Sequence, residues 1–190
     1  MVQNRHSRIL PTAPHHVWEL LTNVPYELIS SAPYEGNGVF PDAWGGFRAP
    51  SGFIPNAPAG HGPFNYIVKT VEPGRRLMFK SVDGKSEFGF VMEQQRDHTK
   101  VSYVLDMPLH GKEYFRYQLV GRHLHNAWIN DVFDNIERAV TLQLAQPAQW
   151  SPWVKLLRRF IGTVKVYDHT WNEGKPDTVP GKPEKIMATL

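Results

Sequence analysis

The order of the secondary-structure signals along the chain constrains the fold more than any single motif does. A short strand-like segment near the N-terminus runs directly into TAPHHVWELL, and an uninterrupted series of β-like segments follows. A long amphipathic segment, YFRYQLVGRHLHNAWINDVFDNIERAV, comes only after the last of these strands. This order predicts an α+β protein in which an antiparallel sheet grips one late helix. Because such a sheet and helix enclose space between them, we expect an interior cavity lined by aromatic side chains.

The predicted sheet rests on alternating apolar residues and on the turns between them. An opening strand is predicted at 5–10. Four further strands are predicted at 64–71, 76–82, 86–95 and 99–107. Glu72-Pro73-Gly74-Arg75 and Asp83-Gly84 are typical tight turns, and such short connections require antiparallel neighbours.

The late helix is predicted to begin near 112–114 and to end at about Gln143. At 100° per residue, one stripe collects most of the apolar side chains of this segment. The predicted stripe consists of Tyr117, Gly121, Leu124, Trp128, Val132, Ala139 and Leu142, with Asn135 inside it. Asp134 falls on the opposite side, so we expect it to face solvent.

The N-terminal half has two further predicted features. A short helix begins at Pro14, and a second helical turn is expected at 26–30, which makes two short N-terminal helices. Residues 32–63 are rich in proline, glycine and aromatic residues, and such long segments are typically lids or binding loops. One short strand is expected within them, near 38–40 or 45–48.

Size and composition favour a soluble protein with one main core. The chain has 190 residues, no cysteine and a formal charge of +3. A charge this small, without a concentrated basic stripe, argues against nucleic-acid binding. No apolar run reaches the length of a membrane span or of a signal peptide, so a cytoplasmic location is expected.

The chain is expected to divide into a main domain, 1–146, and a C-terminal extension, 147–190. The extension contains a short amphipathic helix at about 152–161, followed by a proline-rich tail. The apolar side of this helix has two interpretations. It packs onto the domain or onto a second copy in a homodimer, or else it makes weak contact with an anionic membrane surface.

Three segments resemble one protein superfamily. ILPTAPHHVWELLTNV resembles the opening of the START-like, polyketide cyclase/dehydrase (SRPBCC) superfamily. VEPGRRLMFKS is similar to its turn between strands, and HNAWINDVFDNIERAV is similar to its C-terminal helix. The resemblance covers roughly residues 5 to 143, and its motifs are structural.

The resemblance implies a helix-grip fold, with a curved antiparallel sheet around the last helix and a cavity between them. Members of the superfamily bind lipids, sterols, polyketides or plant metabolites, and some catalyse cyclisation, aromatisation or dehydration. They share no universal catalytic motif, so the resemblance assigns no active-site residue in this chain.

Candidate site residues are polar groups on otherwise apolar faces. His125, Tyr66, Tyr103 and Tyr117 are the candidates for proton transfer or for orienting a ligand. The alternative is that backbone or water simply satisfies each of these groups. The histidine spacings favour no metal site, and no cofactor motif is present, so neither a metal nor a cofactor is expected.

The remaining candidates are the side chains expected to line the cavity. They are Trp128, Asn135, Val132, Leu124, Phe88, Phe90, Met92, Leu105, Trp44, Phe47 and Phe53. Two functions remain open. One is a protein that binds or transfers a hydrophobic small molecule, and the other is a cyclase- or dehydratase-like enzyme.

Overall fold

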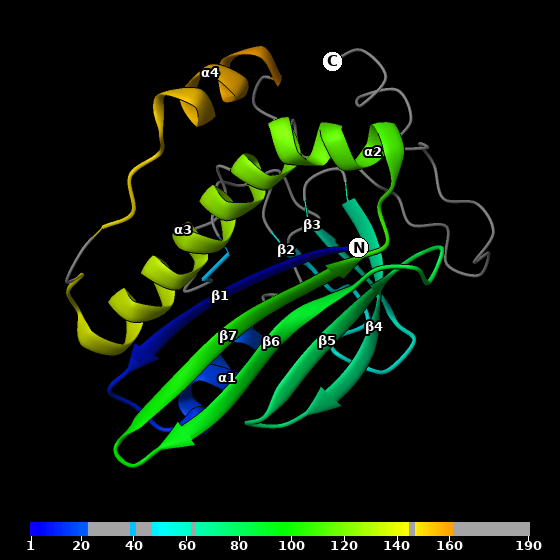
Figure 1. Ribbon diagram of the computed structural model, residues 1–190. Coiled ribbons are helices and arrows are strands. Elements are labelled where there is room, and N and C mark those ends of the chain that lie inside the picture. The colour runs from blue at the N-terminus through cyan, green and yellow to red at the C-terminus, as the bar shows by residue number, and fades with distance from the viewer. Residues whose placement is uncertain (23–38, 41–46, 62–63, 145–146, 162–190) are drawn as a thin grey trace.

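The computed structural model describes residues 1–22, 39–40, 47–61, 64–144 and 147–161. Its centre is a seven-stranded antiparallel sheet in the order β1-β7-β6-β5-β4-β3-β2 (Figure 1). The strands are β1 (Val2–Leu10), β2 (Phe47–Arg48), β3 (Pro58–His61), β4 (Phe64–Glu72), β5 (Arg76–Ser81), β6 (Glu87–Gln95) and β7 (His98–Met107). Each strand from β3 to β7 pairs with the next one along the chain. The first strand, β1, pairs with β7 on the side away from β6.

The four predicted consecutive strands are confirmed as β4 to β7, and each predicted end lies within one residue of the observed end. Gly74 and Gly84 have positive φ angles of 69° and 71°, which is why glycine is favoured in these two turns. The structure adds β3, which the sequence did not predict. The short strand expected near 45–48 corresponds to β2.

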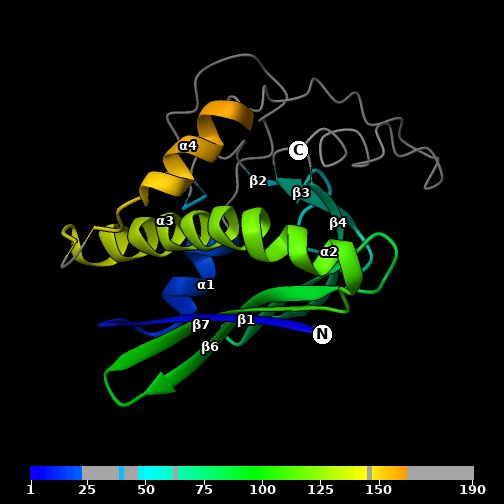
Figure 2. The same ribbon diagram turned by 45° about the horizontal axis from the view of Figure 1, so that its top comes forward.

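The helices are α1 (Pro14–Thr22), α2 (Gly111–Arg116), α3 (Arg122–Thr141) and α4 (Pro152–Ile161). A π-helical segment, Tyr117–Gly121, joins α2 to α3, and the backbone stays right-handed across both junctions. The predicted late helix is therefore confirmed, and left-handed Leu142 ends it. α1 and α3 cover the same face of the sheet, and α4 lies on the far side of α3 (Figures 1 and 2). The second helical turn expected at 26–30 lies outside the described residues.

The buried side of α3 contains Trp128 and Val132 of the predicted stripe, together with Ile129 and Phe133, which the helix period places on its flank. Its buried residues are Ala127, Trp128, Ile129, Val132, Phe133, Asp134 and Ile136. The placement of Asp134 toward solvent was wrong, because its carboxylate is buried in an ion pair. Ala139 is exposed, and Leu142 is 86% exposed because it lies beyond the last helical turn.

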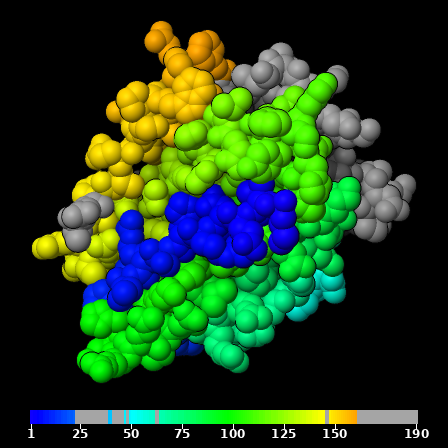
Figure 3. Space-filling model, in the orientation of Figure 1, coloured from blue at the N-terminus to red at the C-terminus, as the bar shows by residue number. Residues whose placement is uncertain are grey.

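β1 presents polar side chains to α3. The strand lies between the long helix and β7 (Figure 3), and its alternate residues Asn4, His6 and Arg8 are only partly exposed. Arg8 Nη1 donates to Asp134 Oδ1 at 2.6 Å and to Glu137 Oε2 at 2.8 Å. Asp134 Oδ2 also accepts from the backbone N–H of Ala148 at 2.6 Å. This ion pair therefore joins β1, α3 and the segment that leads to α4.

Arg8→Met is expected to lower the free energy of unfolding by about 3 kcal/mol, because it leaves a buried carboxylate without its cation. Arg5→Met is the matched control on the same strand, since Arg5 pairs with Asp106 where the side chains are 46% and 31% exposed. An exposed pair contributes about 0–1 kcal/mol. Urea denaturation of both variants measures the difference, and equal losses would show that the Arg8 pair has no special role.

α4 is attached to the outer side of the long helix. Trp150 Nε1 donates to Asp131 Oδ2 at 2.9 Å, and Trp153 Nε1 donates to the carbonyl of Leu119 at 2.9 Å. Val154 and Leu157 are buried beneath α4. The boundary at residue 146 between domain and extension stays a prediction. In the described part of the chain, every helix is too short or too polar to cross a membrane.

Candidate functional site

Two histidine–tyrosine pairs lie beside Trp128, between the sheet and α3. His125 Nε2 lies 3.2 Å from Tyr103 Oη, and His61 Nδ1 lies 3.2 Å from Tyr66 Oη. The His61 ring stacks on Trp128 with centroids 4.5 Å apart and an interplanar angle of 8°. The Tyr103 ring meets Trp128 edge to face at 5.8 Å. We define these five residues as the Trp128 cluster.

The cluster is assembled from four elements of the fold, three strands and one helix. Tyr103 lies on β7 and Tyr66 on β4, where the period-2 alternation of each strand turns these rings to the buried face. His61 ends β3 and pairs in register with Phe64. His125 and Trp128 are three residues apart on α3, so they share one side of that helix.

Asn4 on β1 connects His125 to the other polar groups of the interior. Its Nδ2 donates to Asn126 Oδ1 at 2.7 Å and to Tyr117 Oη at 3.1 Å, and lies 3.3 Å from His125 Nδ1. Asn126 Oδ1 also lies 3.1 Å from His6 Nε2. The side chain of Tyr117 lies against Gly121, where a Cβ would come within 2.9 Å of the tyrosine ring.

This network assigns the hydrogens of the His125–Tyr103 pair. The Asn4 amide has two hydrogens, which it donates to Asn126 and Tyr117, and its nitrogen cannot accept a hydrogen bond. A hydrogen on His125 Nδ1 would point at that NH2 group, so we assign the hydrogen of the neutral ring to Nε2, which then donates to Tyr103 Oη. The Tyr103 hydroxyl then accepts from His125, and within the described part of the chain its own hydrogen has no protein acceptor. Tyr103 is 3% exposed. A buried donor without a partner costs about 1–3 kcal/mol, so this hydroxyl favours an incoming oxygen acceptor.

Four polar groups in and next to the cluster are held in their uncharged forms. Burial, and after it the nearby His61 and His6, which disfavour a second positive charge, together lower the pKa of His125 to about 3. Burial also lowers the pKa of His6 and raises the pKa values of Tyr103 and Tyr117. At neutral pH the site therefore offers hydrogen bonds from neutral imidazole and phenol groups.

Aromatic side chains fill the space next to the cluster. Phe47 stacks on Phe40 at 4.4 Å and on Phe53 at 5.6 Å, and it contacts Tyr66 at 6.0 Å. Phe88 meets Tyr66 edge to face at 4.9 Å. These rings pack against one another, so the part of the interior next to Tyr66 is a hydrophobic wall. A cavity lined by the predicted residues stays a prediction.

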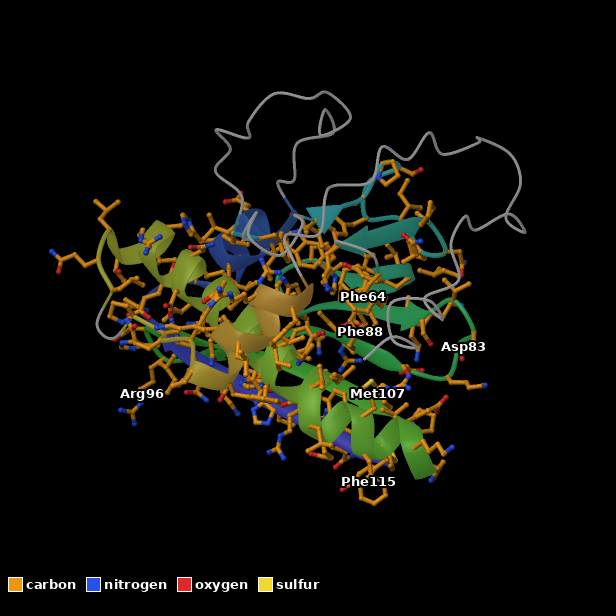
Figure 4. All side chains as sticks on the ribbon, turned by 90° about the horizontal axis from the view of Figure 1, so that it is seen from above. Phe64, Asp83, Phe88, Arg96, Met107 and Phe115 are labelled. Atoms are coloured by element: carbon orange, nitrogen blue, oxygen red, sulfur yellow. The ribbon has the colours of Figure 1, made fainter. Side chains whose placement is uncertain are left out.

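The inward face of the sheet becomes accessible at one end. Phe90 and Leu105 are buried, whereas Phe88 and Met107, on the same faces of β6 and β7, are partly exposed. Phe64 on β4, which β5 separates from β6, is 50% exposed. Figure 4 shows Phe64, Phe88 and Met107 in a row across the strands at this end of the sheet. Within the described part of the chain, the apolar inward face of the sheet is therefore partly exposed at this end.

The other candidate ligand-binding residues are distributed as follows. Met92 and Val132 are buried in the core, together with Phe90 and Leu105. Leu124 is partly exposed. The amide of Asn135 donates to the carbonyl of Val39 at 3.1 Å, so the fold already uses this donor. Trp44 lies outside the described residues.

Four residues of the site, Asn4, His6, Asn126 and His61, are not among the candidates predicted from the sequence. Asn4 and His6 alternate with outward residues of β1, between buried Val2 and Leu10. That alternation was a usable signal for an inward polar face. Nothing local in the sequence indicates that His61 lies on Trp128, because this contact depends on β3 pairing with β4. Among the described residues, no group of three or more histidine, aspartate or glutamate side chains is arranged to hold a metal ion.

No protein-family model matches this chain, and no curated protein sequence matches it. Solved structures do match. The chain is similar to CalU16 from Micromonospora echinospora, with a TM-score of 0.52, 14% identity and coverage of 83% of this chain and 81% of that one. It is similar to protein MLL2253 from Mesorhizobium loti, with a TM-score of 0.52, 13% identity and coverage of 75% and 98%.

A third similar structure is DynU16, a protein in the dynemicin biosynthetic locus, with a TM-score of 0.49, 19% identity and coverage of 76% of this chain. This chain spans 48% of DynU16. The architecture and the matches to CalU16 and MLL2253 agree on the fold. The chain has a helix-grip α+β fold, as the resemblance implied.

Proposed function

We propose that this protein binds a hydrophobic small molecule that carries an uncharged oxygen acceptor, such as a carbonyl group. The observation that carries the proposal is the buried Tyr103 hydroxyl, which accepts from His125 at 3.2 Å and keeps its own hydrogen available for a ligand. Trp128 and the half-buried apolar side chains at the accessible end supply the apolar contact area. The described residues of the cluster carry no cation, so an anionic ligand group is disfavoured there.

A cyclase- or dehydratase-like enzyme is the alternative function. General acid–base catalysis works best when the pKa of the catalyst lies near the working pH. Burial holds the pKa of His125 at about 3, which makes the imidazole a weak base at neutral pH. The raised pKa of Tyr103 likewise makes its hydroxyl a weak acid. These values favour hydrogen bonding to a ligand over proton transfer.

Tyr103→Phe tests the proposal, with Nile red as a neutral carbonyl-containing fluorescent probe. Loss of one hydrogen bond to the probe is expected to weaken binding by about fivefold, since such a bond contributes about 1 kcal/mol. Tyr114→Phe is the matched control, because Tyr114 on α2 is 37% exposed. Equal affinities of the Tyr103→Phe variant and the unaltered protein would refute the assigned role of this hydroxyl.

Native mass spectrometry of the freshly purified full chain, with extraction of any retained molecule, tests the function itself. A retained neutral hydrophobic compound supports the binding protein. An empty protein that also fails to bind Nile red argues against it and transfers support to the enzyme. In that case, single substitutions of His125, Tyr66, Tyr103 and Tyr117 would each be assayed for loss of turnover.

A further inference from the structure

The outward face of α4 is apolar, although α4 is already packed on the protein. At 100° per residue, buried Val154 and Leu157 lie on one side of the helix. Trp153, Leu156 and Phe160 form a second apolar stripe, which remains 42%, 43% and 73% exposed. In the described part of the chain, packing therefore explains one apolar side of α4 and leaves the other partly exposed.

The stripe continues beyond α4. The Trp153 indole donates to the carbonyl of Leu119 at 2.9 Å, which places the tryptophan beside the π-helical segment. Leu119 itself is 64% exposed. We call Leu119, Trp153, Leu156 and Phe160 the outer apolar stripe. On the helical wheel the centre of this stripe lies about 100° from buried Val154 and Leu157, so the stripe flanks the side of α4 that packs on the protein. α4 itself lies on the side of α3 away from the sheet (Figure 2).

Charge next to the stripe indicates what it contacts. On a helical wheel of about 100° per residue with Trp153 at 0°, Lys155 lies at 200° and Arg159 at 240°. Both side chains are exposed, and they border the stripe on the side of Leu156. α4 contains three basic residues, Lys155, Arg158 and Arg159, and no acidic residue. A helix with aromatic and leucine side chains beside lysine and arginine matches the boundary between the acyl chains and the anionic headgroups of a membrane.

We infer that the outer apolar stripe and its basic border dock this protein onto an anionic membrane surface. α4 lies parallel to the surface, inserts Trp153, Leu156 and Phe160 among the lipids, and places Lys155 and Arg159 at the headgroups. Trp153 contacts the same π-helical segment whose Tyr117 belongs to the interior polar network, so docking takes place directly outside the candidate site.

Co-sedimentation of the full chain with vesicles tests this inference. We expect the protein to sediment with vesicles of phosphatidylcholine and phosphatidylserine, and about tenfold less with phosphatidylcholine alone or at high salt. Leu156→Asp/Phe160→Asp and Lys155→Glu/Arg159→Glu are each expected to reduce sedimentation by at least about fivefold. Ile54→Asp is the control, since Ile54 is 60% exposed on a loop of the main domain.

Three outcomes would overturn the inference. The unaltered protein fails to sediment with phosphatidylserine vesicles, or it binds both vesicle types equally and Lys155→Glu/Arg159→Glu has no effect. In the third outcome, Leu156→Asp/Phe160→Asp converts a dimer to a monomer by light scattering and leaves sedimentation unchanged, which assigns the stripe to a second copy of this chain. Nile red binding by the variants is expected to stay unchanged, so a failure here is distinguishable from a failure of the proposed function.

Discussion

Gly89→Ala is expected to prevent stable folding, with a loss of at least about 4 kcal/mol in the free energy of unfolding. Gly89 lies in the middle of β6, paired with Met78 on β5 and Val104 on β7, and its φ angle is 152°. A Cβ at this position would lie 2.2 Å from the carbonyl oxygen of Leu77 and 2.7 Å from the Cα of Met78. Both are backbone atoms of the adjacent strand, so β5 and β6 would have to separate.

The control for this prediction is Gly84→Ala in the turn between β5 and β6. Gly84 also has a positive φ, 71°, but a Cβ there would meet nothing within 4 Å. Its cost is therefore confined to backbone strain, about 1–2 kcal/mol. Urea denaturation followed by circular dichroism measures both variants. If Gly89→Ala costs no more than Gly84→Ala, the close approach of β5 to β6 is not what requires glycine.

The protein is expected to lose on the order of 4 kcal/mol of stability between pH 6.5 and pH 3 through His125 alone. The pKa of His125 is about 3 in the folded protein, against 6.5 for an unperturbed histidine. Over this range the unfolded chain binds more protons than the folded one, so the free energy of unfolding rises with pH. The contribution is fully present above pH 6.5 and is lost as the pH falls toward 3.

Denaturation at pH 7 and pH 5 tests this value. The unaltered protein is expected to lose about 2 kcal/mol more than the His125→Asn variant over this step. His16→Asn is the control, because His16 is exposed on α1 and its replacement removes a histidine that is not buried. His6, whose pKa is also lowered, remains in every variant and contributes the same slope to each. Identical slopes for His125→Asn and the unaltered protein would contradict the assignment to His125.

The strands and the long helix were predictable because their signals are local. The alternation Val101, Tyr103, Leu105 on β7 gives each side chain a face without any knowledge of the neighbouring strands. The turns at Gly74 and Gly84 likewise depend on backbone angles within a few residues. β3 was missed because Pro58–His61 has no apolar alternation of its own and becomes a strand only by pairing with β4.

The candidate site was predictable only in part. A tyrosine or histidine on an apolar face, such as Tyr103 or His125, marks a buried polar group that needs a partner. The partners themselves come from distant parts of the chain: Asn4 is 121 residues from His125. Asp134 is a second example. The helix period predicts that it faces solvent, but its carboxylate is buried because it pairs with Arg8 of distant β1.

By itself, the sequence determined the fold class, the late helix, the faces of the central strands and the presence of inward phenol and imidazole groups, because each depends on the backbone geometry of consecutive residues. Only the tertiary structure decided which of these groups meet. It brought His125 to Tyr103 and His61 to Trp128, and it placed Arg8 against Asp134. Hydrogen bonding, desolvation and burial depend on atoms far apart in the chain, so no local pattern encodes them.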